Sequence, residues 1–177
     1  MEDKNKIKEK NKFKRGFTLI ETFVAISILL IAITGPLYLV TRGLAISKVA
    51  KGQITAMFLA QEAVEYIRNV RDENILNGVS WTVNLENCLI EGQKCRIDST
   101  NPDIETISCG GSECLVLEYN PASHQYNYDG EQSLFRRDIE LIQIPGDKEI
   151  EIVVDMYWNE GPLEHQFTIR EHLLNWQ

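Results

Sequence analysis

The sequence predicts an α+β protein in which one long N-terminal helix, half membrane-spanning and half amphipathic, packs on an antiparallel sheet of three or four strands. Three observations lead to this fold class. A long apolar run follows the first 16 residues, a helical pattern continues to residue 76, and the last part of the chain alternates apolar and polar residues. The expected divisions are a leader 1–16, a membrane helix 17–40, an amphipathic helix 41–76 and a head 77–177.

The leader is basic, whereas the rest of the chain is acidic. The whole chain has 18 basic and 26 acidic residues and a net charge of −8. Residues 1–16 hold seven basic and three acidic side chains, so they carry +4 and the remainder carries −12. A basic segment ahead of an apolar run is typical of an N-terminus that stays in the cytoplasm, which places the acidic head outside. An acidic surface disfavours nucleic-acid binding by the whole domain.

The apolar run at 17–40 contains a single charged side chain, Glu21. As a helix it spans about 36 Å, enough for a hydrocarbon core of about 30 Å. A secretory signal cut near Ala45-Ile46-Ser47 is disfavoured, because the apolar core of such a signal is only about 7 to 15 residues long. An uncut anchor explains the length and orientation of the run, but it does not explain a carboxylate inside the bilayer.

Glu21 is the informative residue of this run. A charge at the centre of a membrane helix costs about 2.5 to 3.5 kcal/mol, and such residues usually mark a function. Alternatively, Glu21 lies near the cytoplasmic interface, where its carboxylate reaches water and the positive end of the helix. Its sequence surroundings add a third interpretation: Lys14-Arg15-Gly16-Phe17-Thr18-Leu19-Ile20-Glu21 resembles the processing site of type IV pilins and of the pseudopilins of type II secretion and competence systems.

The resemblance implies a role for three residues. A prepilin peptidase would cut the bond between Gly16 and Phe17, and Phe17 would then be N-methylated. Glu21 would pair with the terminal amine of a neighbouring subunit, so that neither charge is buried singly in an apolar filament core. The implied partners are the prepilin peptidase, other pilin subunits through the N-terminal helix, a pilus or secretion assembly platform, and the membrane.

The helical pattern continues beyond the apolar run. Pro36, after Gly35, is expected to kink the helix without ending it. From Val49 onward the pattern is amphipathic, and the expected buried face consists of Met57, Leu59, Ala60, Ala63, Val64, Ile67 and Val70. Gln61, Glu65, Arg68 and Asp72 are expected on the other side. The stretch Leu59–Leu76 also resembles the stem of one minor-pilin subgroup, which favours a minor pilin over a major subunit.

The head shows the alternation of strands. Apolar residues occupy every second position from Ile150 to Trp158, and Leu134–Ile144 and Leu163–Leu173 are expected to be the neighbouring strands. Short turns at Pro145-Gly146-Asp147 and Asn159-Glu160-Gly161-Pro162 predict antiparallel hairpins. Two further short strands are suggested, at Trp81–Glu86 and Cys114–Tyr119. Trp158 and Trp176 are interpreted as core or edge aromatics.

Four cysteines fall in a loop region expected at 87–130, namely Cys88, Cys95, Cys109 and Cys114. Outside the membrane an even number of cysteines suggests two disulfides, for which three pairings are possible. Sequence proximity favours Cys88 with Cys95 and Cys109 with Cys114, a nested pairing stays open, and a zinc site is the competing interpretation. The nearby acidic residues Asp98, Asp103 and Glu105 are interpreted as solvated surface, because their spacing matches no calcium loop.

No catalytic residue, metal or cofactor is expected. The sequence contains no nucleophile-elbow, phosphate-loop or zinc-protease motif, and His124, His165 and His172 have no spacing that suggests ligation. The preferred function is therefore a minor pilin or pseudopilin that assembles into a type IV pilus-like filament. The alternatives are a minor pseudopilin of a type II secretion or competence system and, from another class, a membrane-anchored extracytoplasmic binding domain. Recognition is then expected in the region 87–130, which contains Asn101-Pro102, Gly110-Gly111, Tyr119, Tyr126 and Tyr128.

Overall fold

The computed structural model describes residues 16–100, 106–111, 113–146 and 148–175. It divides into two compact units, Met1–Ile46 and Ser47–Gln177. Several residues considered above lie outside the described ones: residues 1–15 of the leader, Asn101-Pro102, Asp103, Glu105, Asp147 and Trp176. The second unit contains part of the helix and the whole sheet, and we call it the head unit.

A single helix, α1, runs from Leu19 to Leu76 and contains Pro36. It therefore joins the two helical segments that the sequence predicts, and Pro36 does not end it. Polar side chains of its apolar half bond back to the helix backbone: the hydroxyls of Ser27 and Thr34 donate to the carbonyls of Phe23 at 2.8 Å and Leu30 at 2.9 Å. Such bonds remove the cost of carrying a hydroxyl into an apolar surrounding.

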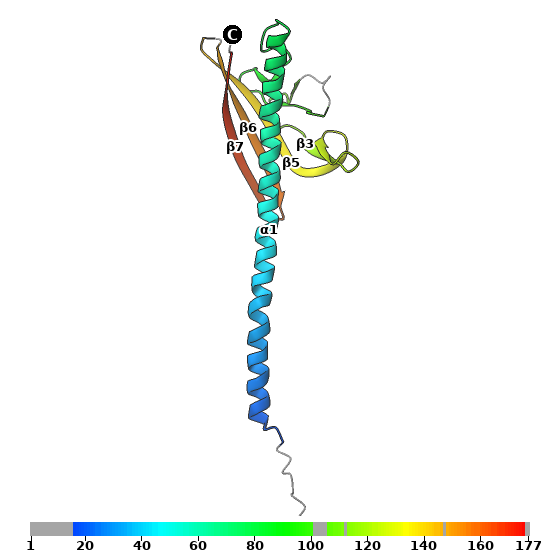
Figure 1. Cartoon of the computed structure of the whole chain (residues 1–177), viewed down its shortest axis with the longest axis vertical. Coiled ribbons are helices and arrows are strands. Elements are labelled where there is room, and N and C mark those ends of the chain that lie inside the picture. The colour runs from blue at the N-terminus through cyan, green and yellow to red at the C-terminus, as the bar shows by residue number, and fades with distance from the viewer. Residues whose placement is uncertain (1–15, 101–105, 112, 147, 176–177) are drawn as a thin grey trace, which may run out of the picture. The chain divides into compact units, whose positions relative to one another are not determined.

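Within the head unit, α1 packs on the sheet through a narrow face of mostly small side chains (Figure 1). The buried apolar residues of this face are Ala56, Leu59, Ala60, Ala63, Val64 and Ile67. One residue predicted for this buried face is wrong: Met57 is 51% exposed, and Ala56, one residue earlier, is buried instead. Both residues are apolar, so the pattern alone does not distinguish them. The alanines let the helix backbone approach the sheet closely.

The end of α1 is fixed by a glycine cap and by a buried asparagine. The N–H of Val79 donates to the carbonyl of Asn74 at 3.0 Å and that of Gly78 to Ile75 at 3.1 Å, which is the Schellman arrangement. Gly78 has the positive φ of 68° that this arrangement needs. The side-chain amide of Asn74 donates to the carbonyls of Trp81 at 3.3 Å and Val83 at 2.8 Å, so the following loop is held against the helix.

Three long strands form the predicted antiparallel meander: β5 Glu131–Ile144, β6 Glu149–Glu160 and β7 Leu163–Leu174. Their pairing is regular, from Phe135 opposite Trp158 to Ile144 opposite Glu149, and β6 pairs with the whole of β7. The meander is therefore confirmed, and so is the α+β fold class.

The sheet has seven strands, not the three or four expected. The additional strands are β1 Cys95–Arg96, β2 Ile107–Ser108, β3 Val116–Asn120 and β4 Gln125–Asn127. Since β6 occupies one edge of β5, strands β3 and β1 follow one another along its other edge, where Val116 lies opposite Arg136 and Cys95 opposite Ile139. The region 87–130 is thus part of the sheet rather than a loop inserted into it.

One of the two suggested short strands is wrong. The segment Trp81–Glu86 forms turns that lead into the 3₁₀ helix η1, Glu86–Cys88. Asn84 has a φ of 67°, which an extended strand does not allow. Trp81 is nevertheless buried. The second suggestion corresponds to β3.

Trp158 lies directly on the helix at Gly52. A Cβ atom at Gly52 would lie 2.9 Å from Nε1 of the Trp158 indole, which is 5% exposed. The indole also stacks on His165, with ring centroids 5.2 Å apart. Trp158 is therefore a core aromatic, and Gly52 is the residue that leaves room for it.

We expect Gly52→Leu to lower the free energy of unfolding by about 1 to 3 kcal/mol, because the new side chain must displace a buried indole. This loss should exceed the gain in helix propensity of about 1 kcal/mol. Urea unfolding of the full chain in detergent, followed by tryptophan fluorescence, measures the change. Gln53→Leu is the matched control at an exposed position of the same helix and should leave stability unchanged. Equal stability of the two variants would contradict the packing argument.

Candidate functional site

The predicted processing site lies immediately before α1. Gly16, Phe17 and Thr18 precede the helix and are exposed. Thr18 caps it, because its hydroxyl oxygen accepts the backbone N–H of Glu21 at 3.3 Å and its carbonyl accepts the N–H of Thr22 at 3.2 Å. The Thr18-x-x-Glu21 spacing is that of a capping box. The Gly16–Phe17 bond is thus kept outside the helix, where a protease can bind it as extended backbone.

Glu21 lies in a shallow apolar groove along the first turns of the helix. The groove is lined by Phe17, Ile20, Glu21, Val24, Ala25 and Ile28. No cation forms an ion pair with Glu21 among the residues that the structure describes. A carboxylate with only apolar neighbours needs a partner that comes from elsewhere once water is excluded.

The apolar half of α1 is long and apolar enough to cross a membrane, by length and composition. Large apolar side chains all around it are exposed, for example Ile20, Phe23 and Leu30. A helix that is apolar on all sides is typical of a membrane span. Together with the motif described below, this helix makes the chain a membrane-anchored, single-pass protein.

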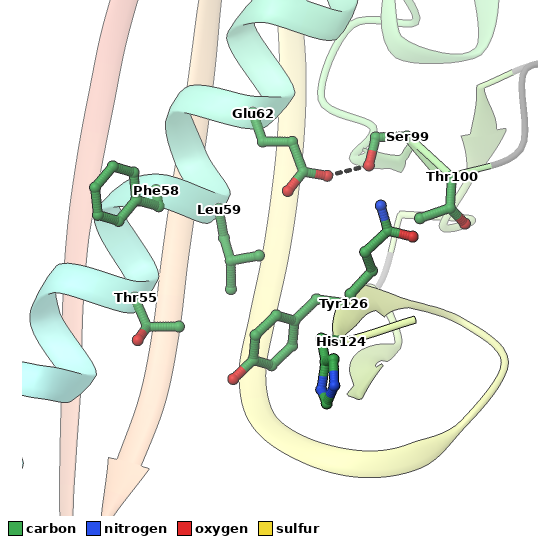
Figure 2. A pocket seen from close by; sticks show the side chains of 9 residues that line it. Thr55, Phe58, Leu59, Glu62, Ser99, Thr100, His124 and Tyr126 are labelled. Carbon is green, nitrogen blue, oxygen red and sulfur yellow. Dashed lines mark hydrogen bonds between the residues drawn. The ribbon is translucent and has the colours of Figure 1, made fainter. Parts of the chain in front are cut away.

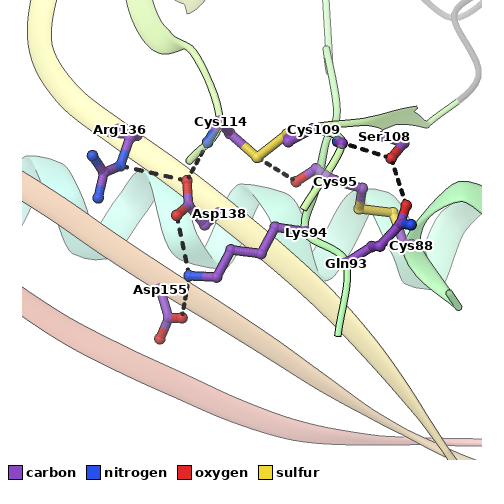
Figure 3. The surroundings of a disulfide bond; sticks show 11 residues. Cys88, Gln93, Lys94, Cys95, Ser108, Cys109, Cys114, Arg136, Asp138 and Asp155 are labelled. Carbon is purple, nitrogen blue, oxygen red and sulfur yellow. Dashed lines mark hydrogen bonds and ion pairs between the residues drawn. A yellow bond between two sulfur atoms is a disulfide. The ribbon is translucent and has the colours of Figure 1, made fainter. Parts of the chain in front are cut away.

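The four cysteines form two disulfides, Cys88–Cys95 and Cys109–Cys114 (Figure 3). This is the pairing favoured by proximity, and the nested pairing is excluded. A zinc site built on these cysteines is excluded as well, because none of them is free. Cys88 and Cys95 are completely buried and connect η1 to β1, whereas the second disulfide closes a turn before β3.

Asp138 holds the second disulfide turn against the sheet. It is 1% exposed and accepts the backbone N–H of Cys114 at 3.2 Å. Asp138 also lies opposite Asp155 of β6. Lys94 Nζ bridges the two carboxylates at 3.2 Å and 3.3 Å, as Figure 3 shows. The lysine thus lies between two like charges that face each other across the strands, and Arg136 Nε adds a second positive charge 3.5 Å from Asp138.

The charge of Lys94 is favoured by these carboxylates. Burial by itself would lower the pKa of the ammonium group, but the hydrogen bond and charge of Asp138, with a further contribution from Asp155, raise the pKa above its ordinary value. The ammonium also lies 5.7 Å from the ring centre of Tyr157. Sequence analysis missed this cluster, although the charged residues Arg136, Arg137 and Asp138 within a predicted strand were a signal for it.

Arg137 makes the corresponding connection on the other face of β5. It is 1% exposed, and its guanidinium donates to the carbonyls of Leu59 in α1 at 2.7 Å and of Ile97 at 3.0 Å. Glu62 lies 3.8 Å from the guanidinium and accepts the hydroxyl of Ser99. Helix, sheet and the segment after β1 are therefore joined by one buried arginine, which sequence analysis also missed.

A groove of about 280 Å³ lies between α1 and the β3–β4 hairpin (Figure 2). It is lined by Thr55, Phe58, Leu59, Glu62, Ser99, Thr100, His124, Gln125 and Tyr126. The imidazole Nδ1 of His124 is 2.9 Å from the hydroxyl of Tyr119. The groove combines aromatic rings, hydroxyls and one carboxylate, which suits contacts with a polar ligand.

Only one of the three tyrosines proposed for recognition lines this groove. Tyr126 packs edge-on against Phe135 at a centroid distance of 5.6 Å, and burial raises the pKa of its hydroxyl. Tyr128 lies under the guanidinium of Arg96, 4.6 Å from it, and burial raises its pKa as well. Tyr119 does not line the groove, but it contacts two residues that do: it lies 2.9 Å from His124 and opposite Tyr126, with ring centroids 5.2 Å apart. The structure therefore brings Tyr119 and Tyr126 together, whereas Tyr128 packs separately under Arg96.

The histidines also lie apart. His165 stacks on Trp158, and His172 lies 2.7 Å from the carboxylate of Glu149. Among the described residues, no three histidines, cysteines or acidic residues form a group that could hold a metal ion.

The comparison with known families agrees with the N-terminal motif. Residues 11–35 match a family model described as the prokaryotic N-terminal methylation motif. No curated protein and no solved structure matches the chain. The match covers Gly16, Phe17 and Glu21, which carry the resemblance, and most of the membrane helix 17–40.

These features define the class of protein. The chain is a membrane-anchored protein that carries the N-terminal methylation motif found in type IV pilins and pseudopilins. The resemblance stated from the sequence is thereby confirmed.

Removing the charge of Lys94 tests how much the cluster of Lys94, Asp138 and Asp155 stabilises the fold. We expect Lys94→Met to lower the free energy of unfolding by roughly 1 to 3 kcal/mol, since it leaves the buried carboxylate of Asp138 without its ammonium partner. The pKa of Lys94 is raised in the folded protein, so its stabilisation is present below the ordinary value of 10.5 and is lost as the pH rises through the folded value. Urea unfolding at pH 7 measures the effect.

Lys148→Met is the control, because Lys148 is exposed and belongs to a turn. Its free energy of unfolding should equal that of the original chain. A Lys94→Met variant as stable as this control would show that the cluster contributes nothing to the fold.

Proposed function

We propose that the chain is a minor pilin or pseudopilin subunit that is cleaved between Gly16 and Phe17, N-methylated at Phe17 and assembled into a type IV pilus-like filament. The observation that carries the proposal is the exposed Gly16–Phe17 bond directly before a capped helix that contains Glu21. The match to the methylation motif supports it. The proposed partners are a prepilin peptidase, other pilin subunits through α1 and an assembly platform.

The proposed orientation has the leader in the cytoplasm and the head unit outside. The positive charge of residues 1–16 supports it, since basic segments flanking a membrane helix stay on the cytoplasmic side. The two disulfides support it independently, because disulfides persist in oxidising compartments.

In the assembled state, Glu21 would pair with the terminal amine of Phe17 in a neighbouring subunit. Cleavage creates this amine four residues before the carboxylate, and its charge is opposite to that of Glu21. Both groups would lie among apolar side chains, where an unpaired charge is far more costly than a paired one. No catalytic role is part of the proposal.

A membrane-anchored binding domain is the second candidate. The groove between α1 and the β3–β4 hairpin is the observation that favours it, because it combines the rings of Phe58 and Tyr126 with hydroxyl and carboxylate groups.

Processing is tested by intact-mass and N-terminal analysis of the full chain produced with and without a prepilin peptidase. We expect a peptidase-dependent product that begins at Phe17 and carries one additional methyl group. The control is Gly16→Val, which adds a branched side chain at the bond to be cut and should stay unprocessed. A chain that keeps Met1 under all conditions would contradict the proposal.

Assembly is tested separately with Glu21→Gln, which keeps the shape of the side chain and removes its charge. We expect normal cleavage at Phe17 but a roughly hundredfold loss of subunits incorporated into filaments, because the terminal amine then lacks its counter-charge. The amount of the chain in filaments sheared from cells measures this. Unchanged incorporation would mean that no such charge pair is needed.

A further inference from the structure

The outer edge of the sheet at β7 is long and open. Strand β7 has 12 residues and pairs with β6, and no other strand of the described chain pairs with it (Figure 1). Its register against β6 continues from Leu163 to Leu174 without a bulge. The outer strands at the opposite edge are short, since β2 has 2 residues and β4 has 3. Edge strands are commonly kept short or interrupted, because their free N–H and C=O groups can pair with another chain.

Another groove, of about 680 Å³, runs between this edge and α1. Its lining includes Ile169 and Glu171 of β7 and, on the helix, Met57 and Phe58. Met57 is 51% and Phe58 66% exposed, so the groove has an apolar part that is open to solvent. From Met57 to Arg68 the helix rises by about 17 Å, which is the length of about five residues of a strand.

A strand added beside β7 would direct every second side chain into this groove. Phe167 packs on the core residue Trp158, and Glu171 bonds to Arg68 of the helix at 2.5 Å, so the odd-numbered residues of β7 face α1. Side chains of neighbouring strands that lie opposite each other share one face of the sheet. The residues opposite Phe167, Ile169 and Glu171 would therefore enter the groove.

One end of the groove has an excess of negative charge. Arg68 lies 3.5 Å from Glu65 and 2.5 Å from Glu171, so a single guanidinium is shared by two carboxylates. The side chains of Glu65 and Glu171 are 63% and 41% exposed. A basic side chain opposite Glu171 would balance the second carboxylate. Such an exposed pair adds little affinity but selects the partner and its register.

We propose that the β7 edge binds an extended segment of another protein as an additional antiparallel strand. In this segment a basic residue is followed by apolar residues two and four positions later. The order follows from the direction of β7, because an antiparallel segment passes Glu171 first, then Ile169, then Phe167. Backbone hydrogen bonds supply affinity in this mode of binding, and the pockets for alternate side chains supply specificity. The inference goes beyond the proposed function and rests on the head unit alone.

A second copy of the chain does not fit as the antiparallel partner. β7 runs in the same direction as α1, since Glu171 bonds to Arg68 and the carbonyl of Leu174 accepts Arg71 at 2.7 Å. Antiparallel pairing of β7 with β7 of a second copy would therefore make the two α1 helices antiparallel. Both copies are anchored in one membrane by the same end of α1, so this arrangement is excluded for the anchored protein.

A synthetic peptide tests the edge. Its order is threonine, lysine, threonine, valine, threonine, leucine, threonine, with both ends blocked and a fluorescent label, and it is titrated against the full chain in detergent, with micelles alone as the blank. We expect saturable binding with a Kd below about 1 mM. We also expect slower amide hydrogen exchange in β7, and not in the opposite edge strand β4, when the peptide is bound.

A second peptide tests whether the backbone is bound. N-methylation of the valine and of the threonine after it keeps every side chain and removes one N–H that faces β7, whichever set of alternate groups points toward it. We expect this peptide to bind at least about tenfold more weakly. Equal binding of the two peptides, absence of saturable binding, or unchanged exchange in β7 would each overturn the inference.

Two variants of the chain test the groove. Met57→Glu places a charge in its apolar part and should weaken binding by about three- to tenfold. Gln166→Glu is the matched control, because it adds the same charge at an exposed position on the other face of β7 and should leave binding unchanged. Equal effects of the two substitutions would show that the groove does not take part.

Hydrogen exchange without the peptide tests the remaining occupant. Protection of β7 that increases with the concentration of the chain would identify a second copy as the partner and overturn the inference. All these measurements use the uncleaved chain, so they are independent of processing at Gly16. A failure of peptide binding leaves the proposed function standing, and a failure of processing leaves this inference standing.

Discussion

The structure depends on one helix that has to satisfy two different surroundings along its length. Apart from the ends and the position of Pro36, the backbone groups of α1 are paired within the helix, so the same element can lie in lipid or against a sheet. The side chains make the difference. In the apolar half, the hydroxyls of Ser27 and Thr34 bond to the helix backbone. In the head unit, Ala56, Ala60 and Ala63 allow the sheet to approach the helix.

The head is held together by two neighbouring residues of β5 that point to opposite faces of the sheet. Arg137 points toward α1 and bonds to the carbonyl of Leu59, whereas Asp138 points away from it and holds Cys114 and Lys94. Successive side chains of a strand alternate between faces, so adjacent residues can join different layers. Each is nearly fully buried, and each bonds to groups of another segment of the chain: Arg137 to two backbone carbonyls and Asp138 to Lys94 and the N–H of Cys114. The central strand therefore connects the helix on one face with the disulfide-closed turn on the other.

The N-terminal end of α1 differs from the head in how its charged group is paired. Its carboxylate, Glu21, has apolar neighbours within its groove and no ion-pair partner among the described residues. Asp138 and Arg137 of the head have ion-pair or hydrogen-bond partners within the described chain, but the carboxylate of Glu21 does not. An unpaired charge in an apolar surrounding is typical of a surface that binds another molecule carrying the opposite charge.

The sequence by itself determined the features that depend on local pattern. The membrane helix, the motif around Gly16 and Phe17, and the three long strands follow from neighbours within a few residues, and these predictions were confirmed as to fold class and motif. The structure decided what depends on contacts across the chain. Strands of two residues such as β1 have no pattern of their own and exist because they pair with β5. The burial of Ala56 instead of Met57, and the partners of Arg137 and Asp138, follow from which elements pack together, because the energy of a buried charge or a close contact comes from residues distant in sequence.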